Sequence, residues 1–392
     1  MIVFSPRVDS ILSLLGIFCA GLLLYMVGIM GFLKDVPQGI DMGVFYKAGQ
    51  LFVNGGNPWL DLMNTGEPFS YPPHGASVLS IYGFLPHKYA LFLHNIINIL
   101  SIAVLAYLAN KWYLKITNWR TMNFAQGLSL AIIIGNPFMM HSLFLGEMVM
   151  PATAMVMLSW HCLNSGRVLL AGIFLGLATI KPQVAFLYVL WLMLNLEIRM
   201  LLVGGLTALL LMIPALSIYG PVGAFQSWIT SFSGYYDVAA NMPGSVHVVG
   251  FESFFAGIGL PGLGWVFKTM GLICLYLLYV KQKHFNSILL IHYVLIISLT
   301  FMFGHDTDYT AIIMLWSLMV YSAIISGSYK KLSVALLLLV VFFLPQRFLR
   351  EIDFPALHHT RTFLVPLCGY FAYKWYKDKI DVTPSAIPDQ QK

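Results

Sequence analysis

Long apolar runs alternate with short polar turns over most of this chain. Runs long enough to cross about 30 Å of hydrocarbon recur at residues 11–33, 89–110, 124–140, 148–164, 200–218, 262–280, 286–303, 308–326, 332–346 and 362–376. The run 167–197 is too long for one span and is interrupted by Lys181-Pro182, so we expect two short helices that meet at a break. The pattern predicts an all-α polytopic membrane protein with about twelve transmembrane helices.

Composition agrees with this class. Hydrophobic residues make up 59% of the chain and charged residues 10%, whereas soluble domains average about 25% charged residues. The net charge of +6 comes from bases scattered over loop ends, with no basic stripe. We therefore expect a lipid bilayer as partner and no nucleic acid.

The placement of the bases supports the twelve-span topology, because Lys and Arg prefer cytoplasmic loops. Without the break at Lys181, every later loop would change sides, and the pairs Lys281/Lys283 and Lys330/Lys331 would lie outside. With the amino terminus inside and the break included, the expected cytoplasmic segments carry Arg7, Lys111, Lys115, Arg120, Arg167, Arg199, Lys281, Lys283, Lys330, Lys331, Lys374, Lys377 and Lys379.

These spans predict a single transmembrane domain over residues 1–380, with external loops at about 34–88 and 219–261. The polar tail 381–392 is expected to be a disordered cytoplasmic segment. In the first loop, apolar residues recur at helical spacing, which predicts an amphipathic helix lying at the membrane interface. They are Val44, Phe45, Ala48, Leu51 and Phe52.

Polar and charged residues gather in segments that the topology places on the external side. Two loops and several short turns meet there, so a site can form from residues distant in sequence. The candidates are Asp41, Tyr46 and Tyr71 in the first loop, Glu147, Lys181, Tyr235 and Tyr236 in the middle of the chain, and His305, Asp306 and Asp308 after a late span.

Several motifs occur in order over roughly residues 41–182. They are Asp41-x-x-x-Phe45-Tyr46-x-Ala48, Gly55-Gly56-Asn57-Pro58-Trp59, Phe69-x-Tyr71-Pro72-Pro73, Leu145-Gly146-Glu147, and a Gly-rich helix from Ala171-Gly172 to Lys181-Pro182. Together they resemble glycosyltransferase family 87, a group of superfamily C membrane enzymes that use polyprenyl-phosphate sugars, typically as α-mannosyltransferases. The chain departs from the family at Glu147, where Gln is usual, and at Met148-Val149, which replace a following polar residue.

The resemblance implies an inverting hexosyltransferase (EC 2.4.1) in the inner membrane, with its site on the periplasmic or extracellular face. It would move a hexose, typically mannose, from a polyprenyl-phosphate donor to a hydroxyl of a glycolipid or cell-envelope glycan. Such a transfer needs a base for the acceptor proton, and the family's catalytic Asp matches Asp41. The alternative is that Asp41 only caps a helix that begins near Gly43.

The donor phosphate needs a cation as negative charge develops on the leaving oxygen, and Lys181 at the helix break fits this role. Alternatively, Lys181 reaches the outer headgroups. His305 is a second candidate for the phosphate, unless its cluster is only a polar surface loop. We assign contacts with the sugar or acceptor to Tyr46, Tyr71, Glu147, Tyr235, Tyr236, Asp306 and Asp308.

The two acids beside His305 are also suitable ligands for a divalent metal ion. The resemblance, however, is to the metal-independent branch, so no metal or other cofactor is expected. The aromatic candidates could equally belong to the interfacial belt of a membrane protein.

Two other classes of function remain open. A secondary transporter suits twelve spans and a broken helix, although no inverted repeat is visible. A non-catalytic polyprenyl-lipid-binding protein would tolerate loss of Asp41.

Overall fold

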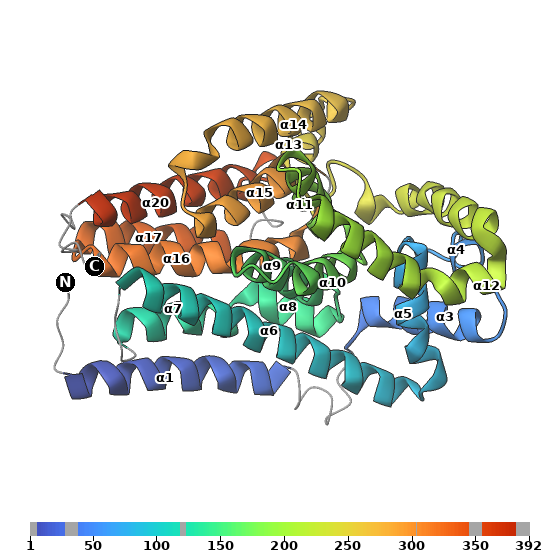
Figure 1. Ribbon diagram of the computed structural model, residues 1–392, viewed down its shortest axis with the longest axis horizontal. Coiled ribbons are helices and arrows are strands. Elements are labelled where there is room, and N and C mark those ends of the chain that lie inside the picture. The colour runs from blue at the N-terminus through green and yellow to red at the C-terminus, as the bar shows by residue number, and fades with distance from the viewer. Residues whose placement is uncertain (1–5, 28–37, 118–122, 303, 345–354, 382–392) are drawn as a thin grey trace, which may run out of the picture.

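The computed structural model describes residues 6–27, 38–117, 123–302, 304–344 and 355–381, and these are almost entirely helical (Figure 1). Within them, β structure is limited to β1 (Val248–Val249) and β2 (Gly304–His305). The predicted disordered tail lies outside the described residues from residue 382 onward. The α-helices are α1 (Pro6–Tyr25), α3 (Ile40–Val53), α4 (Pro58–Asp61), α5 (Pro73–Leu79), α6 (His87–Thr117), α7 (Phe124–Ile134), α8 (Pro137–Leu145), α9 (Val149–Asn164), α10 (Val168–Ala178), α11 (Pro182–Leu194), α12 (Ile198–Asp237), α13 (Phe251–Gly257), α14 (Gly264–Lys281), α15 (Ser287–Phe301), α16 (Ile313–Ile325), α17 (Tyr329–Phe343), α19 (Pro355–His358) and α20 (Arg361–Asp381).

Five of the described helical segments are long and apolar enough to cross a membrane: His87–Leu114, Phe124–Leu145, Ile198–Asp237, Gly264–His284 and Asp306–Ile325. Shorter apolar helices lie at Asp9–Tyr25, Val168–Ala178, Pro182–Leu194 and Ser287–Phe301. The chain is therefore an all-α membrane protein. The count of twelve crossings stays a prediction, although each apolar window of the sequence coincides with a helix.

The outer surface of the bundle is apolar. On α12, Leu202 and Leu210 are more than half exposed, and on α14 the same holds for Trp265 and Ile273. Monomeric soluble proteins rarely expose so much contiguous apolar surface. Hydrocarbon around these helices explains the pattern.

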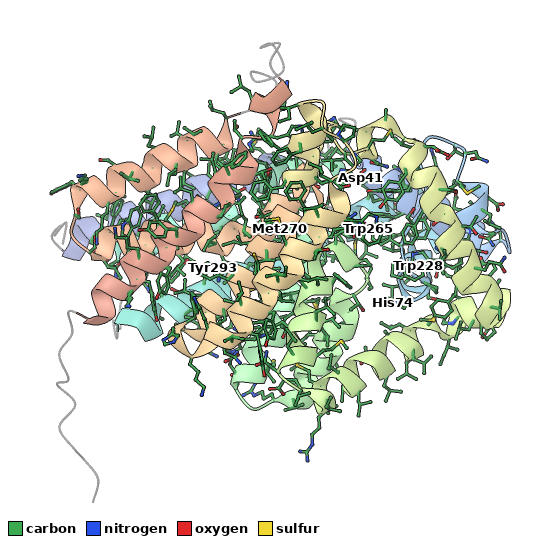
Figure 2. The ribbon with its side chains drawn as sticks, turned by 90° about the horizontal axis from the view of Figure 1, so that it is seen from above. Asp41, His74, Trp228, Trp265, Met270 and Tyr293 are labelled. Atoms are coloured by element: carbon green, nitrogen blue, oxygen red, sulfur yellow. The ribbon has the colours of Figure 1, made fainter. Side chains whose placement is uncertain are left out.

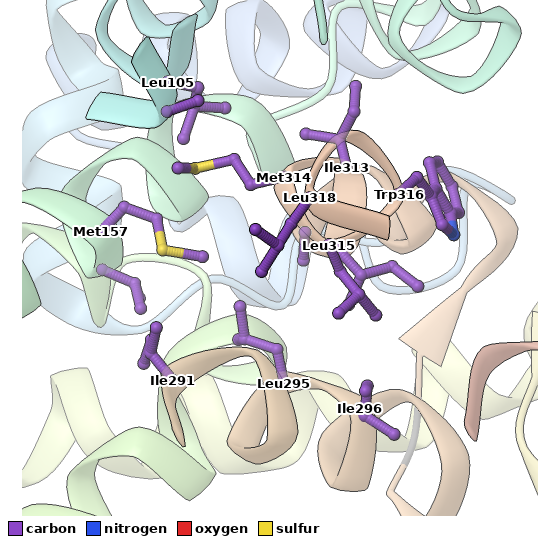
Figure 3. Packing of buried hydrophobic residues seen from close by; sticks show 14 of the residues in the cluster. Leu105, Met157, Ile291, Leu295, Ile296, Ile313, Met314, Leu315, Trp316 and Leu318 are labelled. Atoms are coloured by element: carbon purple, nitrogen blue, oxygen red, sulfur yellow. The ribbon is translucent and has the colours of Figure 1, made fainter. Parts of the chain in front are cut away.

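The core of the bundle surrounds α16, every residue of which is buried. Figure 3 shows Met314 and Leu318 of α16 amid side chains from α6, α9 and α15, including Leu105, Met157 and Leu295. α16 also packs against α7, α17 and α20. A helix buried on all sides needs no polar face, which explains its nearly uniform apolar sequence.

A second, smaller core lies at one end of the molecule, at the right of Figure 1, where α3, α4 and α5 meet the later part of α12. The helix predicted in the first loop is present as α3. Its apolar stripe packs on protein: Phe45 is 2% exposed and Phe52 is 5% exposed. The stripe is covered by α5 and by the 3-10 helix η2 (Ser80–Phe84), so its partner is protein rather than lipid.

The segment predicted as the second external loop, about 219–261, begins as a helix. α12 breaks at Gly220, where φ is 71°, and then continues as a helix to Asp237. Pro221 directly after the break suits the first position of a new helical segment. The continuation is fixed to the first loop: Trp228 Nε1 donates to the Ser70 carbonyl at 3.0 Å, and Asn57 Nδ2 donates to Ser227 Oγ at 2.9 Å.

Candidate active site

The predicted break around Lys181 is present in the structure. α10 ends at Ala178 and α11 begins at Pro182, so Lys181 stands between two helices. Its side chain is almost fully buried, and its ammonium nitrogen lies 2.9 Å from Glu147 Oε2 and 2.9 Å from Asp308 Oδ1. A buried ammonium is tolerated only when it is paired, and here it has two carboxyl partners.

Asp41 lies in the first turn of α3. The N-cap position of this helix is Gly39, so the alternative that Asp41 only caps the helix is wrong. Gly39 and Gly146 both have φ of 75°, a conformation that favours glycine. A Cβ at Gly146 would come within 2.7 Å of Met42 Cβ, and the Gly39 N–H donates to the Phe144 carbonyl at 2.8 Å. This close approach of two backbones brings Asp41 beside Glu147.

The His305 segment reaches the same place through a short antiparallel pairing, in which Val248 stands opposite His305. The 3-10 helix η5 (Asp306–Ile312) starts directly afterwards. Its Thr307 hydroxyl donates to Glu147 Oε1 at 3.2 Å, and the His305 N–H donates to Asp308 Oδ2 at 2.8 Å. Glu147 is thus held by Lys181 on one oxygen and by Thr307 on the other.

These elements enclose a cavity of about 470 Å³. Figure 2 places Asp41 at the same end of the molecule as His74 and Trp228, far from Tyr293. The cavity is lined by residues of α3, of the break at Lys181, of the last turn of α12 and of the segment that starts η5. Its polar lining consists of Asp41, Glu67, Ser70, Tyr71, His141, Glu147, Lys181, Gln183, Tyr235, Asn241, His247, His305, Asp306 and Thr307.

Seven of the residues singled out from the sequence line this cavity: Asp41, Tyr71, Glu147, Lys181, Tyr235, His305 and Asp306. Three others are placed differently. The Tyr46 ring packs edge-on against His87, with ring centroids 5.0 Å apart, and Tyr236 is 48% exposed outside the cavity lining. Asp308 is 1% exposed and supports Lys181 from behind, so it does not face a ligand directly.

Sequence reasoning assigned no role to several lining residues, among them His141, Gln183, Asn241, His247 and Thr307. Gln183 and Thr307 could have been chosen from the sequence. Gln183 directly follows the break at Lys181-Pro182, and Thr307 belongs to the polar segment that contains His305. His141, Asn241 and His247 lie in segments that the predicted topology places on the external side, but no motif or spacing gave them a role.

Burial governs the acid–base properties of the carboxyl pair. Burial raises the pKa of Asp41 to about 8, with further contributions from the charge of Glu147 and from a hydrogen bond with it, while Lys181 acts in the opposite direction. Burial would also raise the pKa of Glu147, but the charge and hydrogen bond of Lys181 outweigh it and lower the pKa to about 2. Near neutral pH, Glu147 is therefore ionised and Asp41 holds a proton.

Among the described residues, no group of three or more His, Cys, Asp or Glu side chains is arranged to share a metal ion. The expectation that catalysis uses no metal stays a prediction.

The match to known families covers much of this site. The family model for glycosyltransferase family 87 matches residues 69–303, more than half of the chain. The chain belongs to glycosyltransferase family 87. The matched segment includes Tyr71, Glu147, Lys181 and Tyr235, whereas Asp41 lies before it and His305 just after it. No curated protein matches the chain. Family 87 membership makes the protein a membrane glycosyltransferase.

Proposed function

We propose that the protein is an inverting hexosyltransferase that takes its sugar, with mannose as the first candidate, from a polyprenyl-phosphate donor. The acceptor would be a hydroxyl group of a glycolipid or cell-envelope glycan. The observation that carries this proposal is the partly buried carboxyl group of Asp41, whose pKa is raised and which lines the same cavity as Lys181.

In this reaction the acceptor oxygen forms a bond to the anomeric carbon while the bond from that carbon to the lipid phosphate oxygen breaks. The electron pair of the breaking bond goes to the phosphate oxygen. Asp41 takes the acceptor proton, so the products are the new glycoside, the lipid monophosphate and a protonated Asp41. No oxidant, reductant or further substrate is needed.

The raised pKa of Asp41 suits a general base. With a pKa of about 8, the ionised form is a far stronger base than an ordinary carboxylate, although only about one tenth of the molecules carry it at pH 7. Glu147 is ionised but accepts hydrogen bonds from Lys181, Thr307 and the Met148 N–H, so it is the weaker base of the pair.

We place the donor phosphate at the part of the cavity lined by Lys181, Tyr235 and His305, and the sugar between this part and Asp41. Tyr71 and Asp306 also line the cavity and are the remaining candidates for contacts with the sugar or acceptor. The donor itself supplies the phosphate, so no separate cofactor is proposed.

The orientation proposed for the membrane rests on the distribution of charge along the helices. The cavity is built where α10, α12 and α15 end and where α9, α11 and η5 begin. The opposite ends of these and neighbouring helices carry a group of bases: Lys111, Arg167, Arg199, Lys281, Lys330, Lys331 and Lys374. This supports a cavity on the non-cytoplasmic side of an inner membrane.

One experiment separates the three classes of function. Purified protein in liposomes would be given a radiolabelled hexosyl polyprenyl phosphate and extracted glycolipids, for the wild type, Asp41→Asn and the control Asp61→Asn. Asp61 is an exposed residue of α4, outside the cavity lining, and its carboxyl oxygen accepts from the Asn57 N–H. We expect transfer by the wild type and by Asp61→Asn, and transfer at least about a hundredfold slower by Asp41→Asn.

Solute flux without transfer by the wild type would instead indicate a transporter. Donor binding without transfer in both the wild type and Asp41→Asn would indicate a non-catalytic lipid-binding protein. The sugar and the acceptor would be identified by comparing lipid extracts of cells with and without the protein.

A further inference from the structure

Two acids at the start of η5, Asp306 and Asp308, have different surroundings in the structure. Asp308 is enclosed by protein: its side chain is 2% exposed, and its Oδ1 lies 2.9 Å from the ammonium nitrogen of Lys181. Asp306 instead lines the cavity, although its side chain is only 11% exposed. The charge of Asp308 is thus compensated within the protein, whereas the carboxyl group of Asp306 is available to a molecule in the cavity.

The carboxylate of Asp306 is held in place but receives no hydrogen bond from the described residues. Its own backbone N–H donates to the His247 carbonyl at 2.9 Å, next to the pairing of β1 with β2, which fixes the position of the residue. The basic group within ion-pair distance is the His247 ring, whose Nδ1 lies 3.9 Å from Asp306 Oδ2. This distance is too long for a hydrogen bond.

A carboxylate so strongly shielded from bulk water is unfavourable unless hydrogen-bond donors reach it, and here they must come from the cavity. Water can supply them in the free protein. Of the parts of a sugar phosphate, the phosphate is excluded because its charge has the same sign as that of Asp306. Hydroxyl groups are neutral donors that suit it, and the two carboxylate oxygens can accept from hydroxyls on neighbouring carbons of a hexose ring.

The position of Asp306 favours the transferred sugar over the acceptor. Asp306 stands between His305, which we place near the donor phosphate, and Thr307, whose hydroxyl donates to Glu147 Oε1 at 3.2 Å. Burial is the main cause of the raised pKa of Asp41, and the charges of Glu147 and Asp306 also contribute to it. The carboxyl group of Asp306 therefore acts on the same part of the cavity in which we place the sugar, between His305 and Asp41.

We propose that Asp306 is a specificity-determining residue, which selects the transferred hexose by accepting hydrogen bonds from its ring hydroxyls. This rests on the proposed transfer from a lipid phosphate sugar. The contact forms no covalent bond and moves no proton, so the balance of the reaction is unchanged. A sugar that lacks the contacted hydroxyl leaves the carboxylate without that donor, and for this reason it is a poor substrate.

The test compares the hexosyl polyprenyl phosphate that the wild type uses best with analogues that each lack one ring hydroxyl. For an analogue without a contacted hydroxyl, we expect kcat/KM of the wild type to fall about ten- to a hundredfold. In Asp306→Ala the carboxylate is absent, so the intact sugar and the same analogue should be used with nearly equal kcat/KM. The measured quantity is the ratio of the two kcat/KM values within each protein.

Two further variants sharpen the comparison. Asp306→Asn keeps one acceptor oxygen without the charge, so its ratio should lie between those of the wild type and Asp306→Ala. Asp237→Asn is the control: Asp237 is exposed at the end of α12, outside the cavity lining, and this variant should keep the wild-type ratio. Because both sugars are assayed on the same preparation, a loss of folded protein lowers both rates alike and leaves the ratio unchanged.

The outcomes also separate this inference from the proposed function. If the wild type transfers no sugar from any polyprenyl-phosphate donor, the proposed function fails. If the wild type transfers sugar and the ratio for every analogue is the same in Asp306→Ala, the function stands and the role of Asp306 is overturned. A raised KM for the acceptor in Asp306→Ala, with unchanged ratios among the donors, would also overturn it and would assign Asp306 to the acceptor.

Discussion

The two buried cations Lys181 and Arg361 differ in their partners, which are carboxyl groups for Lys181 and backbone carbonyls for Arg361. Lys181 is 4% exposed, contacts two carboxyl groups and lines the cavity. Arg361 is 3% exposed and donates from Nε to the Phe342 carbonyl at 2.9 Å and from its terminal nitrogen to the Leu344 carbonyl. Its guanidinium carbon lies 5.0 Å from the centre of the Phe138 ring, and it is absent from the cavity lining.

The difference shows that burial of a charge does not by itself identify a functional site. Arg361 satisfies carbonyl groups at the end of α17, which have no partner within their own helix. Lys181 instead holds two acids that a membrane protein has no packing reason to bury, next to a third carboxyl group with a raised pKa. We therefore assign a structural role to Arg361 and a functional one to Lys181.

Lys181→Met should have the largest effect of the changes that test this comparison. It leaves Glu147 and Asp308 buried without a counter-charge, which should cost about 3–5 kcal/mol of stability, and sugar transfer should fall below detection. Thermal unfolding in detergent and the transfer assay measure the two effects. The control Lys268→Met removes a partly exposed pair with Glu252 and should cost less than about 1 kcal/mol.

A second change separates charge compensation from packing at Lys181. Lys181→Met combined with Asp308→Asn removes one of the two uncompensated acids, so it should recover part of the lost stability but none of the activity. Equal stability of the single and double variants would show that the carboxyl contacts of Lys181 do not matter energetically.

Arg361→Met should affect stability alone. Loss of the guanidinium leaves buried carbonyls of Phe342 and Leu344 unsatisfied, at about 1–3 kcal/mol for each group. The kcat of the folded fraction should stay near that of the wild type, because Arg361 does not line the cavity. A variant with unchanged unfolding and a large loss of kcat would refute the contrast between the two cations.

Glu147→Gln should have a moderate effect, visible in the pH profile of transfer. The charge of Glu147 helps to raise the pKa of Asp41 to about 8, so removal of this charge should move the rise in activity to lower pH. Gln is also the residue that family 87 usually has at this position. An inflection that stays near pH 8 in Glu147→Gln would mean that Glu147 does not control the proton on Asp41.

A separate effect is expected on the pH dependence of stability. The carboxyl group of Asp41 has a pKa of about 8 in the folded protein and 3.8 as an ordinary carboxyl. The folded state therefore binds more protons between these values, and this group's contribution to stability falls as pH rises from about 4 toward 8. Relative to the wild type, Asp41→Asn should lose less stability over this range. Parallel curves for the two proteins would contradict the raised pKa.

Hydrophobic patterning predicted the helices well because each apolar window is long and ends at Pro, Gly or charged residues. The break at Lys181 could be predicted for the same reason, since Pro182 cannot continue the preceding helix. The partner of an apolar stripe could not be predicted. Phe45 and Phe52 face protein instead of lipid, and only the tertiary position of α5 and η2 decides this.

The candidate residues gathered as expected wherever their segments end at the same side of the bundle, as with Asp41, Lys181 and His305. Whether a given residue faces the cavity also depends on the direction in which its side chain points from the helix. Tyr235 and Tyr236 are neighbours in sequence, yet only Tyr235 lines the cavity, because successive residues of a helix point about 100° apart. Asp308 likewise turns away from the cavity toward Lys181, which its spacing from Asp306 did not reveal.

The most direct test of the account is the pH profile of sugar transfer from a polyprenyl-phosphate donor by the wild type and by Asp41→Asn in the same liposomes. We predict that kcat/KM of the wild type rises with pH to a plateau above about 8. We also predict that Asp41→Asn, folded as judged by its unfolding curve, is slower by about 10²–10⁴-fold and lacks this rise. Transfer by Asp41→Asn at the wild-type rate, with the same profile, would contradict the role of Asp41 as the base.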